Sequence, residues 1–274
     1  MEYSNRTMIF GRDHELKGEI YSQSVESPNV ALSTSVGVTS KPNEDAIGVT
    51  TVGMEMILAI ADGHWGREAS EIAILKAMEL ISPELRPAGE NETRARLFSL
   101  FEQVNSQLYE MGTAAQGALT PETTLIVCHI KRAESGKYLY WASFGDSFLF
   151  LMRSGQLRQI NSLHPRWLGY LSKLSEGAES RANLMRFLTD ESRYMGVARG
   201  LETGKEKLES GDIIFLCTDG LVGSDKAPDP SVLKGITQIL TSDFPLDSKA
   251  ENMIALALNR GEKDNITCGM ASLP

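Results

Sequence analysis

The sequence predicts one α+β domain, a four-layer αββα sandwich of two antiparallel β-sheets that pack face to face with helices outside. Short apolar runs come first, two helical patterns follow, further apolar runs come next, and two helices and a strand close the chain. No repeat of fixed period and no low-complexity linker divides the chain, so a single layered domain is expected.

Strand patterns dominate the chain from residue 30 onward. Branched and apolar residues form three early runs at Val30–Gly37, Ala46–Val52 and Met54–Ala61, with turn residues Pro42 and Gly53 between them. Later runs of the same kind are Thr123–Lys131, Lys137–Phe144, Phe148–Met152, Asp212–Cys217 and Ile266–Ser272. We expect each run to form a strand.

Helices are predicted where apolar residues recur every three or four positions. Two such segments, Glu68–Ile81 and Thr93–Met111, separate the early strands from the later ones, and Ser231–Leu240 and Ser248–Asn259 follow near the end. The apolar stripes of these helices are expected to cover the outer faces of the sheets.

Two segments stand apart from this pattern. Residues 1–29 are polar and weakly patterned, and we expect an N-terminal extension or an irregular first strand before a catalytic domain over 30–274. Residues 162–196 are polar, mixed in charge and weakly periodic, which indicates a flap inserted in that domain.

Composition narrows the function classes. The 274 residues carry a formal net charge of −9 without a basic stripe, so no nucleic-acid partner is expected. No apolar run reaches the roughly 18 residues that a membrane helix needs, and Met1–Arg12 shows no secretory signal. The three cysteines, an odd number inside apolar runs, indicate reduced buried thiols and a cytoplasmic protein.

Four aspartates lie at predicted strand ends. Asp45 precedes the run that begins at Ala46, Asp62 and Asp219 each follow a strand and precede a glycine, and Asp264 precedes the last strand. A single Asp-Gly pair usually marks only a turn. Several carboxylates at strand ends instead favour a site for hard divalent cations, which bind oxygen ligands.

The motifs around these aspartates resemble those of the type-2C, metal-dependent serine/threonine protein phosphatases, the PPM family. In chain order the matching segments are Asn43-Glu44-Asp45, Asp62-Gly63-His64-Trp65-Gly66, Thr123-Thr124, Gly145-Asp146-Ser147, Thr218-Asp219-Gly220-Leu221 and Asp264-Asn265-Ile266-Thr267. In order and rough spacing, the resemblance covers the chain from about Val30 to Ser272. The resemblance implies hydrolysis of phosphoserine and phosphothreonine by direct attack of a metal-bridging hydroxide.

The resemblance also implies a role for each matching residue. Asp62 would bridge two Mn²⁺ or Mg²⁺ ions, and the Gly63 carbonyl would bind the first ion. Asp219 and Asp264 would hold the second. Asp45 and Glu44, also counted in the metal set, would orient metal-bound waters.

Proton transfer is assigned to His64, which directly follows the metal-binding turn and would act as general acid beside the catalytic Asp62. The alternative is a turn histidine bonded to backbone. Asp146 has two open interpretations, a weak third divalent site or a β-turn aspartate, and Gly223 stands where relatives often carry a further aspartate.

The chain departs from the family pattern in two places. Many relatives carry a phosphate-clamping arginine three residues before the first motif, where this chain has Ser40 followed by Lys41, so these two residues are the expected phosphate-binding pair. Trp65 replaces a glycine beside the metals. These departures keep open a phosphatase-like binding or sensor module with reduced catalysis, whereas the retained carboxylates favour an active enzyme.

The expected partners are phosphoserine and phosphothreonine proteins in a signalling pathway that includes a cognate serine/threonine kinase, with no nucleic acid and no membrane. A third alternative is a metal phosphohydrolase for small phosphoesters such as nucleotides. No glycine-rich phosphate loop followed by Lys-Ser or Lys-Thr supports nucleotide binding.

Overall fold

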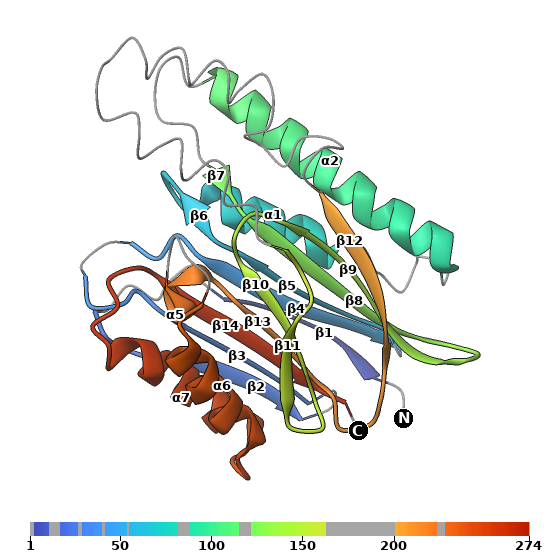
Figure 1. Ribbon diagram of the computed structural model, residues 1–274. Helices are drawn as coiled ribbons and strands as arrows, with labels where there is room; N and C mark the ends of the chain where they lie inside the picture. The colour runs from blue at the N-terminus through green and yellow to red at the C-terminus, as the bar shows by residue number, and fades with distance from the viewer. Residues whose placement is uncertain are drawn as a thin grey trace.

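The computed structural model describes residues 3–10, 17–26, 29–39, 42–53, 55–81, 88–114, 122–162, 201–223 and 228–273. Two six-stranded sheets form its centre (Figure 1). In the first sheet every neighbouring pair is antiparallel. Its spatial order is β1 (Tyr3–Phe10), β4 (Ala46–Gly53), β5 (Glu55–Ala61), β8 (Leu125–Ala133), β9 (Gly136–Phe144) and β12 (Glu202–Leu208).

The second sheet is antiparallel throughout as well. Its order is β11 (Gln156–Gln159), β10 (Phe148–Arg153), β13 (Ile213–Cys217), β14 (Ile266–Ser272), β3 (Asn29–Ser35) and β2 (Tyr21–Glu26). Two further strands, β6 (Gly63–His64) and β7 (Glu122–Thr123), pair with each other to form a two-stranded antiparallel ribbon.

Helices cover the outer face of each sheet. The first sheet packs against α1 (Glu68–Met78) and α2 (Glu90–Ala114), and the second packs against α6 (Pro230–Thr241) and α7 (Leu246–Leu258), with the short α5 (Asp219–Val222) at one end. Figure 1 shows the two helical layers on opposite sides of the paired sheets. The predicted four-layer αββα sandwich is therefore confirmed.

Three hydrophobic clusters fill the three spaces between these layers. Successive residues of β5 face different clusters: Ile57 packs towards α1 and α2, whereas Leu58 packs between the sheets. Both faces of the central strands are buried, so these strands are continuous apolar runs rather than alternating patterns.

The N-terminal part of the chain differs from the expectation of an extension or one irregular strand. Residues 3–10 form β1, which pairs with β4 in the first sheet, and residues 21–26 form β2, which pairs with β3 in the second. Each strand has one neighbour only, and an edge strand tolerates the polar residues that concealed this pairing in the sequence.

The other expected elements appear with small shifts of their ends. Three further strands were not predicted: β11 and β12, each at the edge of a sheet, and the short β6. The expected flap at 162–196 lies outside the described residues apart from Ser162. No helix in the described ranges is both long enough and apolar enough to cross a membrane.

Candidate metal centre

The strand register brings the two N-terminal aspartates together at one end of the first sheet. Ala46 pairs with Ala61 across β4 and β5. Asp45 directly precedes Ala46 and Asp62 directly follows Ala61, so the two carboxylates leave the same end of one strand pair. Asp45 is 2% exposed and Asp62 is 9% exposed, so both are buried.

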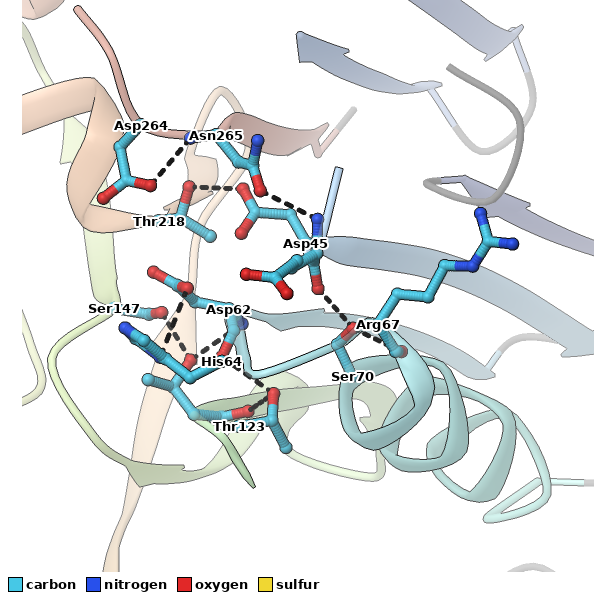
Figure 2. A network of polar contacts seen from close by, with 12 residues as sticks. Asp45, Asp62, His64, Arg67, Ser70, Thr123, Ser147, Thr218, Asp264 and Asn265 are labelled. Atoms are coloured by element: carbon cyan, nitrogen blue, oxygen red, sulfur yellow. Dashed lines mark hydrogen bonds and ion pairs between the residues drawn. The ribbon is translucent and has the colours of Figure 1, made fainter. Parts of the chain in front are cut away.

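The second sheet presents its aspartates at the same end of the sandwich. Cys217 pairs with Cys268 at the end of β13 and the beginning of β14. Asp219 opens α5 two residues beyond Cys217, and Asp264 lies two residues before β14 begins. Figure 2 shows Asp264, Asp45 and Asp62 around a common space.

Asp146 reaches this end from the turn between β9 and β10, which belong to different sheets. It is buried. Its neighbour Ser147 is hydrogen-bonded to Thr124 (Oγ to Oγ1, 2.8 Å), and Thr124 Oγ1 accepts from the backbone N–H of Asp62 at 3.0 Å. The Thr123 hydroxyl donates to the Asp62 carbonyl. The Thr123-Thr124 pair and Ser147 therefore fix the backbone of Asp62.

Hydroxyl groups from the second sheet hold Asp45. The Thr218 hydroxyl donates to Asp45 Oδ2 at 3.0 Å and accepts from the Thr267 N–H at 3.1 Å. Thr267 is in turn bonded to Thr34, which accepts from the Asn43 side-chain amide. This buried chain of hydroxyls connects β3, β13 and β14 to the carboxylate of Asp45, and Figure 2 shows its last contact, from Thr218 to Asp45.

Two glycines allow the loops of the site to approach closely. A Cβ on Gly63 would lie 2.3 Å from the Glu44 carbonyl oxygen, and one on Gly220 would lie 2.0 Å from the Asn265 carbonyl oxygen. No side chain fits at either distance. The glycine that follows Asp62 and the glycine that follows Asp219 are thus required by backbone packing as well as by any ligand.

The aspartates raise each other's pKa. Burial raises the pKa of Asp62 well above its ordinary value, and the charges of Asp45, Asp219, Asp146 and Asp264 raise it further. The pKa of Asp219 is raised by burial and by the charges of Asp146, Asp264 and Asp45. Burial raises the pKa of Asp45 to about 7, although hydrogen bonds from Thr267 and Thr218 oppose this. Cations at this position would remove the repulsion that produces these shifts.

The donor set fits hard divalent cations. Every candidate ligand is an oxygen, and the buried Asp45 Oδ1 has no hydrogen-bond partner among the described residues. In the same part of the chain, no three His, Cys, Asp or Glu side chains are already placed to hold one ion together. A hydrogen bond between Asp62 and Asp219 lowers the pKa of Asp219, so cation binding has to replace this contact.

His64 and Glu44 lie at the edge of this carboxylate group. The His64 side chain is 43% exposed, and its Nδ1 lies 4.0 Å from Asp62 Oδ1. Glu44 Oε1 accepts from the Gly66 N–H at 2.6 Å, and the Glu44 N–H donates to the Asn265 side chain. Glu44 therefore ties the turn after His64 to the loop that carries Asp264.

The expected phosphate-binding residues Ser40 and Lys41 lie outside the described residues. Sequence reasoning identified every aspartate of the group. It also identified Thr123, Thr124 and Thr218 as parts of motifs, but not the hydrogen bonds that they make. It did not foresee the hydroxyl chain through Thr34 and Thr267, because those contacts depend on the pairing of strands far apart in the sequence.

A second polar group was also missed at the opposite end of β5. His129, expected simply to be packed in an apolar strand, is buried but has its Nε2 2.7 Å from Glu55 Oε2. Lys131 Nζ lies 3.4 Å from the other Glu55 oxygen. This group lies seven positions from Asp62 along β5 and stabilises the fold away from the carboxylates.

Comparison with known proteins gives consistent relatives, although no protein-family model matches the chain. Protein phosphatase PhpP of Streptococcus pneumoniae (strain D39) is 28% identical over 253 residues, which cover 89% of this chain and 97% of that protein. A putative protein phosphatase 2C-type of Streptococcus pyogenes serotype M6 is 26% identical over 257 residues, with 88% and 96% covered.

Solved structures agree with these relatives. The S. agalactiae serine/threonine phosphatase is 25% identical, with a TM-score of 0.66 over 93% of this chain and 100% of that chain. The catalytic domain of the phosphatase PstP, solved with two manganese ions, is 25% identical, with a TM-score of 0.65 over 93% and 99%. In sequence and in fold, this chain is therefore similar to the type-2C, metal-dependent serine/threonine phosphatases, the PPM family.

Proposed function

We propose that this protein is a metal-dependent phosphatase that hydrolyses phosphoserine and phosphothreonine in proteins without a covalent intermediate. The observation that carries this proposal is the convergence of Asp45, Asp62, Asp146, Asp219 and Asp264 at one end of the sandwich, where burial and mutual repulsion raise the pKa of Asp62. A protein keeps such a group only if something compensates the charge, and divalent cations do so.

Five residues would hold two Mn²⁺ or Mg²⁺ ions. Asp62, on which the charges of Asp45, Asp219, Asp146 and Asp264 all act, would contact both ions. The Gly63 carbonyl would bind the first ion, and Asp219 and Asp264 would bind the second. Asp45 presents its unpartnered Oδ1 to the same space. When bound, the two cations supply positive charge for the phosphoryl oxygens and a nucleophilic water at neutral pH.

The remaining site residues position water, a third ion and protons. Glu44 and Asp45 would orient water molecules at the site, and Asp146 would contribute to a weaker third divalent site. His64 would donate a proton to the leaving serine or threonine oxygen. Its partial exposure and its position beside Asp62 support this role, because the ring lies between the carboxylates and solvent.

A covalent cysteine intermediate is disfavoured. Cys128, Cys217 and Cys268 are fully buried, and burial raises the pKa of each thiol. A thiol of this kind is neither accessible to a phosphoprotein nor ionised at neutral pH.

The substrate is proposed to be a phosphoprotein, as for the phosphatases that this chain resembles. A serine/threonine kinase must supply such substrates, since no other class of reaction forms these phosphate esters from protein hydroxyls and a nucleotide. Ser40 and Lys41 remain the predicted phosphate-binding pair, and the cytoplasmic location remains a prediction from the cysteine content.

The test is phosphate release from a phosphothreonine peptide with Mn²⁺, with Mg²⁺ and with EDTA. Wild-type protein is expected to release phosphate with either metal and to stop in EDTA. Asp219→Asn should lose most of the activity, and its Mn²⁺ affinity, measured by titration calorimetry, should fall. Asp243→Asn, which removes an exposed carboxylate between α6 and α7, is the matched control and should behave like wild type.

Two outcomes would contradict the proposal. Activity that persists in EDTA would exclude the metal-dependent reaction. A folded protein that binds Mn²⁺ but releases no phosphate under any condition would favour the binding or sensor module instead.

A further inference from the structure

Trp65 has an unfavourable backbone conformation in the turn after the candidate metal centre. Its φ is +64°, and the only other described residue apart from glycine with positive φ is Ser154, in a β-hairpin turn. A left-handed backbone is costly for a large side chain, and non-glycine residues that adopt it concentrate at functional sites. A tryptophan at such a position therefore requires an explanation.

The surrounding structure forces this conformation on Trp65. β6 and β7 hold the preceding residues, since Gly63 pairs with Thr123 and His64 with Glu122. On the other side, the Gly66 N–H donates to the Glu44 carboxylate, and α1 begins at Glu68. The turn is fixed at both ends, so the strain at Trp65 cannot relax by a shift of its neighbours.

Burial of the Trp65 side chain does not offset the energy of this backbone strain. It is 48% exposed, and it belongs to none of the three hydrophobic clusters of the described residues. The strain therefore keeps a large aromatic surface in contact with solvent. Trp65 directly follows His64, whose Nδ1 is 4.0 Å from Asp62, so this surface lies at the edge of the proposed reaction centre.

The charges next to Trp65 favour a cationic ligand. The Glu68 carboxylate folds back over Gly66, where Oε2 lies 2.4 Å from the place a Cβ would occupy, and Glu68 is exposed. The nearby cation, Arg67, has its Nε 3.7 Å from Glu71, and Figure 2 shows its side chain directed away from Asp62. An exposed indole beside a carboxylate attracts a lysine or arginine side chain by cation–π and ionic interactions.

We propose that Trp65 and Glu68 form a binding site for a positively charged side chain that flanks the phosphorylated residue of the substrate. This inference rests on the proposed phosphatase activity and adds a substrate preference to it. Two adjacent parts of one peptide would then be bound: its phosphate at the metal centre and its basic side chain on the Trp65–Glu68 surface.

The experiment compares phosphothreonine peptides in which a single arginine is placed at each of the three positions before and after the phosphothreonine, against the all-alanine peptide. The measured quantity is the ratio of kcat/KM for an arginine peptide to kcat/KM for the alanine peptide with Mn²⁺. Wild-type protein should prefer at least one arginine peptide by about 2- to 5-fold, which is the range of an exposed cation–π contact.

Four variants test the two residues of this site. Trp65→Asn, whose new side chain tolerates positive φ, should reduce the kcat/KM ratio to about 1. Glu68→Gln should reduce the ratio by a smaller factor, and the ratio that remains should no longer depend on salt concentration. Leu75→Ala removes another exposed apolar side chain from α1 and should retain the wild-type ratio. A thermal unfolding scan of Trp65→Gly should show a melting temperature no lower than that of wild type.

The outcomes separate this inference from the proposed function. If no peptide is hydrolysed in a metal-dependent way, both fail. If peptides are hydrolysed but wild type shows no arginine preference, or Trp65→Asn keeps that preference, the Trp65–Glu68 site is refuted while the phosphatase stands. A lower melting temperature of Trp65→Gly would show that the indole serves stability, which also overturns the inference.

Discussion

The buried carboxylates make a distinctive prediction about pH: without metals, this protein should become more stable as the pH falls from 8.0 towards 5.5. The perturbation is removal of divalent cations by EDTA. Burial raises the pKa of Asp45 to about 7 in the folded protein, against an ordinary value of 3.8. Between these values the folded protein holds a proton that the unfolded chain releases, so the free energy of unfolding falls as the pH rises.

The magnitude follows from one proton. A single such group changes the free energy of unfolding by at most about 1.4 kcal/mol per pH unit. From pH 5.5 to about 7, Asp45 alone therefore lowers stability by about 2 kcal/mol. Asp62 and Asp219, whose pKa values are also raised, act in the same direction. Glu55 has a lowered pKa, so its contribution is lost only when the pH falls below the ordinary value of 4.5, outside this range.

The assay is urea unfolding in EDTA at half-unit steps of pH, on wild type and Asp45→Asn. Asparagine keeps an acceptor for the Thr218 hydroxyl but cannot titrate, so the wild-type curve minus the variant curve gives the contribution of Asp45 together with its effect on the pKa of Asp62 and Asp219. The difference should change by about 2 kcal/mol between pH 5.5 and 7. Parallel curves would refute the reasoning, because they would mean that Asp45 is ionised in the folded protein over the whole range.

Mn²⁺ in excess should reverse the trend, since protonated carboxylates bind cations poorly and a ligand stabilises the folded state that binds it. The metal-loaded protein should therefore be more stable at pH 8.0 than at 5.5. If EDTA and Mn²⁺ give the same pH dependence, the raised pKa values do not belong to the cation site.

Three further substitutions test separate parts of the structure. Glu55→Gln should lower the free energy of unfolding, measured in urea at pH 7, by about 1.5–3 kcal/mol, because it weakens the contacts to the buried His129 and Lys131. A loss below about 0.5 kcal/mol would contradict this, because it would be no larger than that of an ordinary exposed ion pair. Gly220→Ala should abolish phosphate release and weaken Mn²⁺ binding, because its Cβ would lie 2.0 Å from the Asn265 carbonyl oxygen. Gly89→Ala, with open space around its Cβ, is the control for Gly220 and should match wild type. Thr218→Val should cost about 1–3 kcal/mol of stability and reduce Mn²⁺ affinity in a calorimetric titration, whereas Thr218→Ser should restore both.

The sequence was most informative where strands are buried on both faces. β5 and β13 are continuous apolar runs, since β5 packs between α1 and the second sheet, and their ends could be placed within a residue or two. In the two six-stranded sheets, the strands that the sequence did not identify as regular strands are β1, β2, β11 and β12, and all four are at sheet edges. Polar and charged residues keep such edges from pairing with other molecules, and the same residues erase the strand pattern.

The site divides in a similar way. An aspartate at the end of an apolar run can be recognised from the sequence, so the acidic residues were found together. The Thr34–Thr267–Thr218 hydroxyls and the contact of His129 with Glu55 depend on register, because each links residues from different strands. Trp65 shows a third case: the sequence revealed an unusual residue, but only the backbone showed that it is strained.

The origin of the carboxylates explains why cations should stabilise the whole fold and not just a loop. Asp45 and Asp62 leave the first sheet, Asp219 and Asp264 leave the second, and Asp146 lies in the turn that joins them. The apolar cluster between the sheets holds them together along their length, but at this end the buried Asp45 and Asp62 of the first sheet face the partly buried Asp219 and the exposed Asp264 of the second. Cations bound there would replace repulsion between the sheets by attraction. Their removal should therefore weaken the contact between the two sheets, so that global unfolding, rather than a local change at the site, reports metal binding.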